Sequence, residues 1–414
     1  MKKISLVNLP AQYESEKEEI LNCVDQVFST GKFVSISAVK EFEVQVAEFC
    51  GVAHAVALSS GTDALILSLK GLGIGPGDEV ITPANSHFAS TASIVQVGAQ
   101  PVFGDVEDDQ NISPESIKAA ITPHTKAIMP VHLTGRIADM NAILEIAQEH
   151  DLLIIEDASQ SIGARYHDQL SGSFGHAAAF SAHPLKNLNA AGDAGFMLTN
   201  DAQLAESVGR LRHHGLKDRD TLVQWGRVAR MDVLQAEILK IRLAKLPSVI
   251  EKRRRNAALY YSLLRQDHVQ ISPSQPYEFN TFNLFVVHVD RRDELAHFLM
   301  KRGVKTAIHY PLPLHLQPTA AEFGYKEGDL PNIERQAKRI LSLPVHQFLS
   351  EDDITYVADS VNNFYDWSVL FDFYPDKIRV IVNENFCISI YIQISIMRDI
   401  QARLSFWFWG YFKV

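Results

Sequence analysis

Hydrophobic positions along the chain follow two periods, one typical of helices and one typical of short buried strands. Near the N-terminus, apolar residues recur at helical spacing over residues 16–28 and 39–49, for example at Phe42, Val46 and Phe49. From residue 56 to residue 198, short aliphatic runs alternate with helical patterns. Strands are expected at residues 54–58, 79–82, 101–106, 126–131, 152–155 and 177–180. This alternation predicts an α/β fold with a mostly parallel sheet covered by helices on both faces.

The pattern changes after Thr199. Residues 204–211 and 232–246 read as helices, and Pro247 follows the second of them. Pro247 and the basic run 252–255 suggest a hinge into a smaller α+β domain, although such a run is more often a solvated helix face. We therefore expect a large domain over 1–247 with N-terminal helices, a small domain over 248–365, and an atypical tail over 366–414. The small domain is expected to contain a strand at 282–289 and helices at 294–302 and 352–364.

Composition narrows the classes of protein that fit. The 414 residues are 46% hydrophobic and 21% charged, with a formal net charge of −10, so there is no electrostatic case for nucleic-acid binding. Cys23, Cys50 and Cys387 are too few and too far apart for a disulfide framework or a metal cluster, which fits a reducing cytosol. We expect no signal peptide and no spanning helix, because no long uninterrupted apolar run is present. These features predict a cytoplasmic protein without a metal or a membrane partner.

Candidate chemistry lies where two of the expected strands end. Asp157 follows the aliphatic run 152–155, and Lys186 follows the run 177–180. Ligands of open α/β sheets bind beyond the carboxyl ends of the strands, so both side chains are expected at one crevice. A lysine there can form a Schiff base with pyridoxal phosphate, and an acid can keep the pyridine nitrogen protonated. The alternative is an ordinary surface lysine and a loop aspartate.

Two further stretches fit the same cofactor. A Ser-Gly-Thr turn that contains Gly61 and Thr62 opens a helix, and free N–H groups at a helix N-terminus favour a phosphate. His87 follows another strand, where its ring could stack on a flat cofactor. Each has an alternative: the turn could be an ordinary helix cap, and His87 a hydrogen-bonded residue at a helix start.

In this order along residues 4–365, the motifs resemble the PLP-dependent sugar aminotransferases of the DegT–StrS type, which have the aspartate-aminotransferase fold (fold type I). The resemblance rests on GKF at Gly31, SSGTDAL at Ser59, GIGPGDEVITPAN at Gly73, PVF at Pro101, TKAIMPVHLTG at Thr125, EDASQSIGARY at Glu156, FSAHPLKNL at Phe180, GDAG at Gly192, RMDVLQAEIL at Arg230, IHYPLPLHLQ at Ile308 and LSLP at Leu341.

The resemblance implies a role for each matching residue. Lys186 would form the Schiff base and act in catalysis together with Asp157, which would hold the pyridine nitrogen. The other roles it implies are a contact with the cofactor ring and its phenolic oxygen for Gln160, phosphate ligands for Ser181, Gly61 and Thr62, a stacked ring for His87, and substrate contacts for His309, Tyr310 and His315.

The implied reaction is a ping-pong transfer of an amino group from glutamate to a keto-sugar nucleotide, for the amino sugars of a surface polysaccharide or related glycan. The implied assembly is a homodimer, in which the Arg230 segment crosses into the neighbouring active site. Three alternatives stay open. A sugar dehydratase of the same family would carry histidine in place of Lys186, a non-catalytic regulator could keep the fold, and a dinucleotide-binding dehydrogenase would need a G-x-G-x-x-G that does not open the first helix after a strand.

The sequence departs from the family pattern in three places. Val228 stands where the family commonly has an asparagine that reaches the partner's phosphate, and its side chain cannot form a hydrogen bond. Ile36 replaces a glycine usual after GKF, which puts the conformation of that loop in doubt. From Asp366 the tail loses the resemblance, and its segment 386–397 has high β propensity and low charge. An added strand or membrane-surface element is one interpretation, and read-through or frameshifted sequence is the interpretation we favour.

Overall fold

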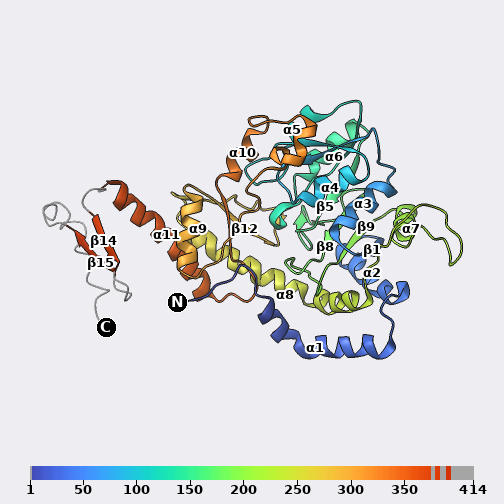
Figure 1. Ribbon diagram of the computed structural model, residues 1–414, viewed down its shortest axis with the longest axis horizontal. Coiled ribbons are helices and arrows are strands. Elements are labelled where there is room, and N and C mark those ends of the chain that lie inside the picture. The colour runs from blue at the N-terminus through green and yellow to red at the C-terminus, as the bar shows by residue number, and fades with distance from the viewer. Residues whose placement is uncertain (1, 374–377, 383–387, 393–414) are drawn as a thin grey trace. The chain divides into compact units, whose positions relative to one another are not determined.

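The computed structural model describes residues 2–373, 378–382 and 388–392, with side chains described as far as residue 366. The chain divides into two compact units, Met1–Ala358 and Asp359–Val414. Figure 1 shows the chain coloured by residue number. The motifs from GKF at Gly31 to LSLP at Leu341 all lie in the first unit.

A seven-stranded sheet forms the centre of the first unit, in the order β1-β9-β8-β5-β4-β2-β3. From β8 to β3 all neighbours are parallel, whereas β9 runs antiparallel to both β1 and β8. The mostly parallel sheet predicted from the sequence is therefore confirmed. Its strands are β1 (His54–Leu58), β2 (Glu79–Pro83), β3 (Gln100–Gly104), β4 (Thr125–Ile128), β5 (Leu153–Asp157), β8 (Ala177–Ser181) and β9 (Gly195–Thr199).

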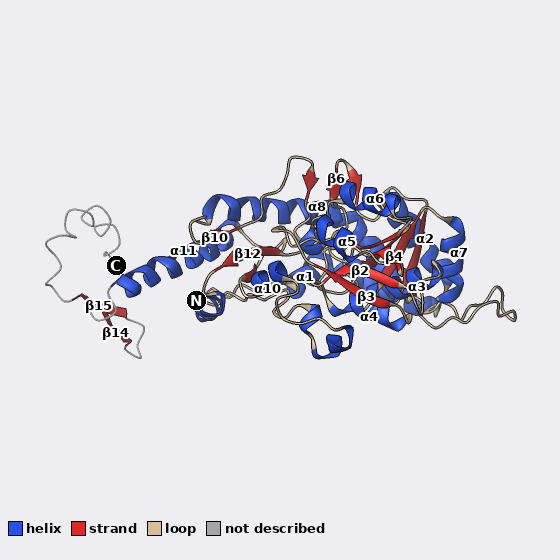
Figure 2. Ribbon diagram, turned by 90° about the horizontal axis from the view of Figure 1, so that it is seen from above, coloured by secondary structure: helices blue, strands red, loops and turns tan. Residues whose placement is uncertain are grey.

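Helices cover both faces of this sheet (Figure 2). Along β8, Ala178 and Phe180 pack in one cluster with α2 and α8, whereas Ala177 and Ala179 pack in another with α3 and α7. Successive side chains of a strand point to opposite faces, so a strand buried on both sides is apolar throughout, as β8 is. The helices of this part are α1 (Leu9–Thr30), α2 (Ile36–Cys50), α3 (Gly61–Gly71), α4 (Phe88–Gln96), α5 (Pro114–Ala120), α6 (Met140–Glu149), α7 (Ala202–Leu211) and α8 (Val233–Leu263).

Helix α8 runs without a break through Pro247, so the predicted helix end at residue 246 was wrong. A proline inside a helix removes one backbone hydrogen bond and crowds the preceding turn. Packing outweighs that cost here, because α8 packs against α1 and α2 and buries Leu246 and Ile250 almost completely. Burial of a large aliphatic side chain stabilises by about 1.5–3 kcal/mol each. The domain boundary predicted at this proline stays a prediction.

Two smaller sheets complete the first unit. One has the order β10-β12-β13 and the other the order β11-β6-β7. The second joins Glu278 and Phe279 to Tyr166 and Arg165, so it pairs segments from both sides of the predicted domain boundary. The remaining elements are β6 (Arg165–Tyr166), β7 (Gln169–Leu170), β10 (Val269–Gln270), β11 (Glu278–Phe279), β12 (Phe285–Val289), β13 (Ile340–Leu343), α9 (Arg292–Lys301), α10 (Pro331–Ala337) and the 3-10 turns η1 (Leu133–Gly135), η2 (Leu314–Leu316) and η3 (Pro318–Phe323).

The C-terminal unit contains an antiparallel pair, β14 (Ile378–Val382) and β15 (Ile388–Ile392), in which Val380 lies opposite Ile390. Helix α11 (Glu351–Phe373) extends from the first unit into this one. The predicted strand-forming segment 386–397 is thus a strand at 388–392, and its other residues, Cys387 among them, lie outside the described residues. Whether the tail is native or read-through sequence stays a prediction.

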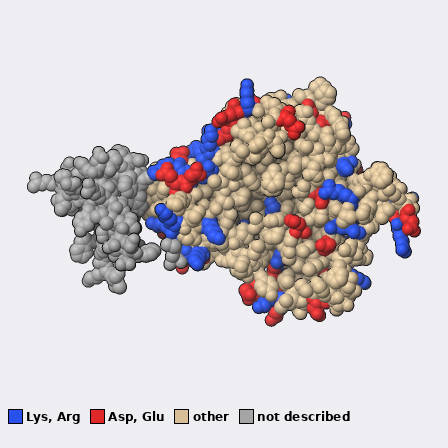
Figure 3. Space-filling view, viewed as in Figure 1, with Lys and Arg blue, Asp and Glu red and all other residues tan. Residues whose placement is uncertain are grey.

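Charged side chains of both signs are scattered over the face shown in Figure 3, so neither sign dominates that face. Within the described ranges, no helix is both long enough and apolar enough to cross a bilayer.

Candidate active site

The carboxyl ends of β5 and β8 place the two central side chains of the predicted site. Asp157 is the last residue of β5, and β8 runs parallel beside it, with Asp157 opposite Ala179. The Asp157 carboxylate is buried and accepts hydrogen bonds from the Ser90 hydroxyl at 2.6 Å and from the Ser159 N–H at 3.2 Å. Lys186 follows in the loop after β8, so both side chains reach the same edge of the sheet.

Lys186 and Asp157 line one cavity of about 420 Å³. The structure also brings seven other residues predicted from the sequence to this cavity: Gly61, Thr62, His87, Gln160, Ser181, His309 and Tyr310. A volume in this range suits a bound small molecule.

One end of the cavity is built to receive an anion. The Ser60 hydroxyl caps α3 by accepting a hydrogen bond from the Asp63 N–H at 3.0 Å, and the first-turn N–H groups of Gly61 and Thr62 have no partner within the helix. A side chain at Gly61 would place its Cβ 2.8 Å from the Cβ of Ser181, so glycine is needed for this contact. Gly195 has the same role behind the turn, because a Cβ there would lie 2.3 Å from the carbonyl carbon of Ser60. This helix N-terminus can hold a phosphate against the Ser181 hydroxyl.

The environment of Lys186 favours its neutral, nucleophilic form. Burial lowers the pKa of Lys186 to about 8, although the negative charge of Asp157 acts in the opposite direction. With that pKa, roughly 10% of the amines are neutral at pH 7, against roughly 0.04% for an ordinary lysine. The site therefore prepares Lys186 for attack on an aldehyde.

Ring-bearing residues form another wall. The His87 ring lies 6.0 Å from the Tyr310 ring between centroids, and its Nδ1 also caps α4 by accepting a hydrogen bond from the Ala89 N–H at 3.2 Å. Both interpretations of His87 from the sequence are thus compatible, because a capping residue here also faces the cavity. Burial lowers the pKa of His309 to about 4, so this imidazole is neutral at pH 7. Burial also raises the pKa of Tyr310, whose hydroxyl shares a hydrogen bond with the Gln160 side chain.

One predicted residue lies elsewhere. His315 is only 1% exposed, its Nε2 lies 3.1 Å from Glu334 Oε1, and its ring packs near those of Phe103 and Tyr325. It does not line the Lys186 cavity. The expected substrate contact for His315 therefore finds no support in this cavity, and its ring nitrogen contacts Glu334 of α10 instead.

The model of the DegT/DnrJ/EryC1/StrS aminotransferase family matches residues 14–362. The chain belongs to this family. It is 42% identical over 366 residues to the "Pleiotropic regulatory protein" of Geobacillus stearothermophilus, an alignment that covers 87% of this chain and 98% of that relative. It is 39% identical over 364 residues to the dTDP-3-amino-3,4,6-trideoxy-alpha-D-glucose transaminase of Streptomyces venezuelae, covering 87% of this chain and 96% of that protein.

A solved structure of this family has the same fold. The S. venezuelae protein DesV, in complex with a ketimine intermediate, superposes with a TM-score of 0.86 at 39% identity, covering 88% of this chain and 99% of that chain. The resemblance to the aminotransferase fold predicted from the motifs is thus confirmed, and so is pyridoxal phosphate as the cofactor of this aminotransferase.

The residues of the cavity fit this cofactor. The anion-binding end at Gly61 suits its phosphate, and the buried Asp157 carboxylate, which no lysine or arginine of the described residues contacts as an ion pair, suits a protonated ring nitrogen. Lys186 would supply the amine for its aldehyde.

Two of the three departures from the family pattern lie within the first unit. Val228 is 57% exposed on the segment before α8, and its backbone bridges His213, so its side chain is directed away from the core of the chain. Ile36 is the first residue of α2, and Ser35 caps that helix through the Ala38 N–H at 3.4 Å. The loop after GKF therefore ends in a regular helix start without a glycine.

Sequence reasoning missed two residues of the site. Ser90 on α4 donates to Asp157. Arg253 on α8 lines the cavity, although the basic run 252–255 was interpreted as part of a hinge, with a solvated helix face as the alternative. A signal for Arg253 was present, because it falls on the buried stripe of α8 formed by Leu246, Ile250, Ala257 and Tyr260.

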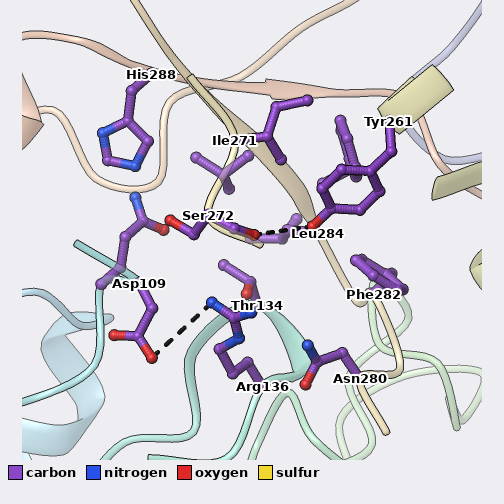
Figure 4. A pocket seen from close by; sticks show the side chains of 13 residues that line it. Asp109, Thr134, Arg136, Tyr261, Ile271, Ser272, Asn280, Phe282, Leu284 and His288 are labelled. Atoms are coloured by element: carbon purple, nitrogen blue, oxygen red, sulfur yellow. Dashed lines mark hydrogen bonds and ion pairs between the residues drawn. The ribbon is translucent and has the colours of Figure 1, made fainter. Parts of the chain in front are cut away.

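A second cavity lies beside Arg136 (Figure 4). Its volume is about 40 Å³, room for only one or a few waters. The Arg136 guanidinium lies 2.9 Å from Glu278 and 4.0 Å from Asp109, and the Tyr261 hydroxyl donates to the Ser272 carbonyl at 2.9 Å. Its charges are paired within the protein, so this cavity is not the candidate active site.

Proposed function

We propose that this protein transfers an amino group from glutamate to the keto group of a sugar nucleotide, in the biosynthesis of amino sugars for a surface polysaccharide or related glycan. The observation that carries the proposal is the single cavity in which Lys186, with its lowered pKa, lies with the buried Asp157 and the anion-binding turn at Gly61. Transaminase relatives of the S. venezuelae kind support the sugar-nucleotide acceptor.

The roles of the residues follow from their chemistry. Pyridoxal phosphate supplies an electron sink when it is bound. Asp157 keeps the ring nitrogen protonated, and Ser90 and the Ser159 N–H hold its carboxylate in place. Lys186 Nζ would act first as a general base, taking the proton from the donor's α-carbon. It would then act as a general acid, giving the proton to the carbon of the cofactor's aldehyde group. Gly61, Thr62 and Ser181 bind the phosphate, and the neutral His309 with Tyr310 contacts the substrate.

The active form we propose is a homodimer. Support comes from large apolar side chains that the chain leaves exposed, since Trp225 is 85% exposed and Val34 is 54% exposed. Light scattering of the purified protein tests this, and a monomer at micromolar concentration would contradict it.

A cytoplasmic location is also part of the proposal, and the two described cysteines, which are buried and free, agree with a reducing compartment.

A regulator without catalysis is the second candidate. The name of the G. stearothermophilus relative favours it, and so does Val228, which cannot form the hydrogen bond that the family asparagine makes. The cofactor-binding residues predicted from the sequence all line the cavity, which argues for the enzyme.

The test is an absorbance spectrum of the protein loaded with pyridoxal phosphate, before and after glutamate. We expect a visible band that glutamate bleaches in the wild-type protein, and no such lysine-dependent band in Lys186→Ala. Sugar nucleotides linked to dTDP or UDP that carry a keto group are then screened for restoration of the band. If saturating cofactor gives no lysine-dependent band, the enzymatic proposal fails and the regulator remains.

A further inference from the structure

Arg253 differs from the other buried arginines of the described residues. Arg136, Arg212 and Arg253 are each at most 6% exposed. Arg136 lies 2.9 Å from Glu278, and Arg212 lies 2.5 Å from Glu43. Arg253 forms no ion pair with any carboxylate among the residues that the structure describes.

The backbone holds one side of the Arg253 guanidinium and leaves the other unused. Its Nη1 donates to the carbonyls of Phe282 at 3.1 Å and Asn283 at 3.3 Å. Its Nε is buried and has no acceptor, and no hydrogen bond of Nη2 is found within the described part of the chain. The Nε and Nη2 hydrogens lie on one edge of the planar group, and this edge is the fork that matches a carboxylate with two parallel hydrogen bonds.

The position of Arg253 makes a ligand the natural partner for this edge. Arg253 lines the Lys186 cavity together with Asn283, whose side-chain oxygen is also buried without a donor. Burial lowers the pKa of Arg253 to about 10, so the group is still charged at neutral pH. A buried charge without a counter-charge destabilises a fold, and an anion that enters this cavity would compensate it.

We propose that Arg253 binds a carboxylate of the dicarboxylic amino donor and of the oxo acid it becomes, and so selects glutamate over amines without that group. This inference rests on the proposed function. A carboxylate fits better than a phosphate, because the free edge offers two donors in a plane, whereas the turn at Gly61 already supplies backbone N–H groups for a phosphate. The diphosphate of the sugar nucleotide is the other anion that enters the cavity, and the experiment separates the two.

The first experiment measures binding of glutarate to the enzyme loaded with pyridoxal phosphate, by titration calorimetry. Glutarate carries the two carboxylates but no amino or keto group, so it cannot react. In Arg253→Lys, which keeps the charge but loses the fork, glutarate is expected to bind about 10- to 100-fold more weakly. The matched control is Arg254→Lys. Arg254 donates to the Asn280 carbonyl of the same loop at 2.9 Å and stacks on Phe279, but it does not line the cavity, so its variant should bind glutarate as the wild type does.

The second experiment compares the two half-reactions in single turnovers. Arg253→Lys is expected to raise the glutamate concentration needed for half-maximal bleaching about tenfold or more, while the sugar-nucleotide half-reaction of the aminated enzyme keeps its rate. Loss in the sugar-nucleotide half-reaction alone would assign Arg253 to the diphosphate and overturn the proposal. Unchanged glutarate binding would overturn it as well, and would leave Arg253 as a residue that only holds the Phe282 loop.

A measurement on the unaltered enzyme covers the case in which Arg253→Lys does not fold. Glutarate should bind the wild type far more tightly than glutaramide, its uncharged diamide, and equal affinities would overturn the proposal. These outcomes are distinct from failure of the proposed function. An enzyme that binds glutarate through Arg253 but is not bleached by glutamate would refute the transaminase and keep the carboxylate site.

Discussion

Around Lys186, a cavity of about 420 Å³ is lined by two cations, Lys186 and Arg253, that form no ion pair within the described residues. Around Arg136, a cavity of about 40 Å³ contains a cation that lies between the carboxylates of Glu278 and Asp109. Both cavities lie in the first unit and both contain buried charge (Figure 4 shows the second).

The difference lies in what completes each charge. The charge of Arg136 is balanced by carboxylates of the chain itself, so its ion pair contributes to the stability of the fold. Burial has lowered the pKa of both Lys186 and Arg253. Neither forms an ion pair within the described residues, although the negative charge of Asp157 partly offsets the effect of burial at Lys186. Such groups destabilise the protein unless a ligand completes them, which is why perturbed and unpaired groups in a cavity mark a functional site. Variants of each cavity should therefore change different measured quantities.

The largest effect is expected for Asp157→Asn. An amide cannot compensate a protonated ring nitrogen, so the rate of the glutamate half-reaction should fall about 1,000-fold, which corresponds to about 4 kcal/mol. Stopped-flow bleaching of the visible band measures this rate. The urea unfolding midpoint should change little, and a variant within tenfold of the wild-type rate would show that Asp157 does not serve the cofactor.

Glu278→Gln, in the Arg136 cavity, is expected to lower the stability of the fold and leave the reaction rate unchanged. The substitution keeps the shape of the side chain but leaves Arg136, 6% exposed, with only the distant Asp109 as counter-charge. Breaking a buried pair in this way costs about 3 kcal/mol of unfolding free energy. Urea unfolding of the cofactor-loaded enzyme measures the loss, while the glutamate half-reaction at 25 °C should keep its rate. An equal loss of rate would mean that the two cavities are coupled.

Much of this contrast was visible in the sequence, but not all of it. The strand ends at Asp157 and the run before Lys186 predicted one crevice because parallel strands bring their carboxyl ends to one edge. The sequence alone could not predict that His315 lies outside the cavity, because His309 and Tyr310 of the same motif do line it. Only the fold shows that its ring packs beside Phe103 and that Glu334 pairs with it.

Helix α8 shows a different limit of sequence reasoning. Pro247 predicted a helix end from local chemistry, whereas long-range packing against α1 and α2 continues the helix. A helix that ended at residue 246 would leave the basic run 252–255 in a hinge or on a solvated face, outside the site. A continuous helix places Arg253 on the same stripe as Ile250 and Ala257, so an error about one proline concealed a residue of the site.

An effect of up to the same size but of opposite sign is expected for Lys186→Met in the protein without cofactor. The folded-state pKa of Lys186, about 8, lies below its usual value near 10.5, so the protonated amine is penalised in the folded state. Below pH 8 the Met variant should therefore be more stable than the wild type, by up to about 3 kcal/mol. The advantage should shrink as the pH rises from 8 to 10.5, where the wild-type amine becomes neutral in both states. Urea unfolding at pH 7 and pH 10 measures the difference, and a variant less stable than the wild type at pH 7 would mean that the Lys186 charge is compensated within the fold.

The smallest effect is expected for Ser90→Ala. The Ser90 hydroxyl donates to the Asp157 carboxylate at 2.6 Å, and the Ser86 hydroxyl lies 2.6 Å from it in turn. Without this donor the carboxylate loses one of its two hydrogen bonds but keeps its charge, so the glutamate half-reaction should slow about fivefold, or about 1 kcal/mol. Ser93→Ala is the matched control, because Ser93 is buried on the same helix and donates only to the Ser90 carbonyl, at 2.7 Å. If both variants slow the reaction equally, α4 acts through packing alone, and the hydroxyl of Ser90 does not position Asp157.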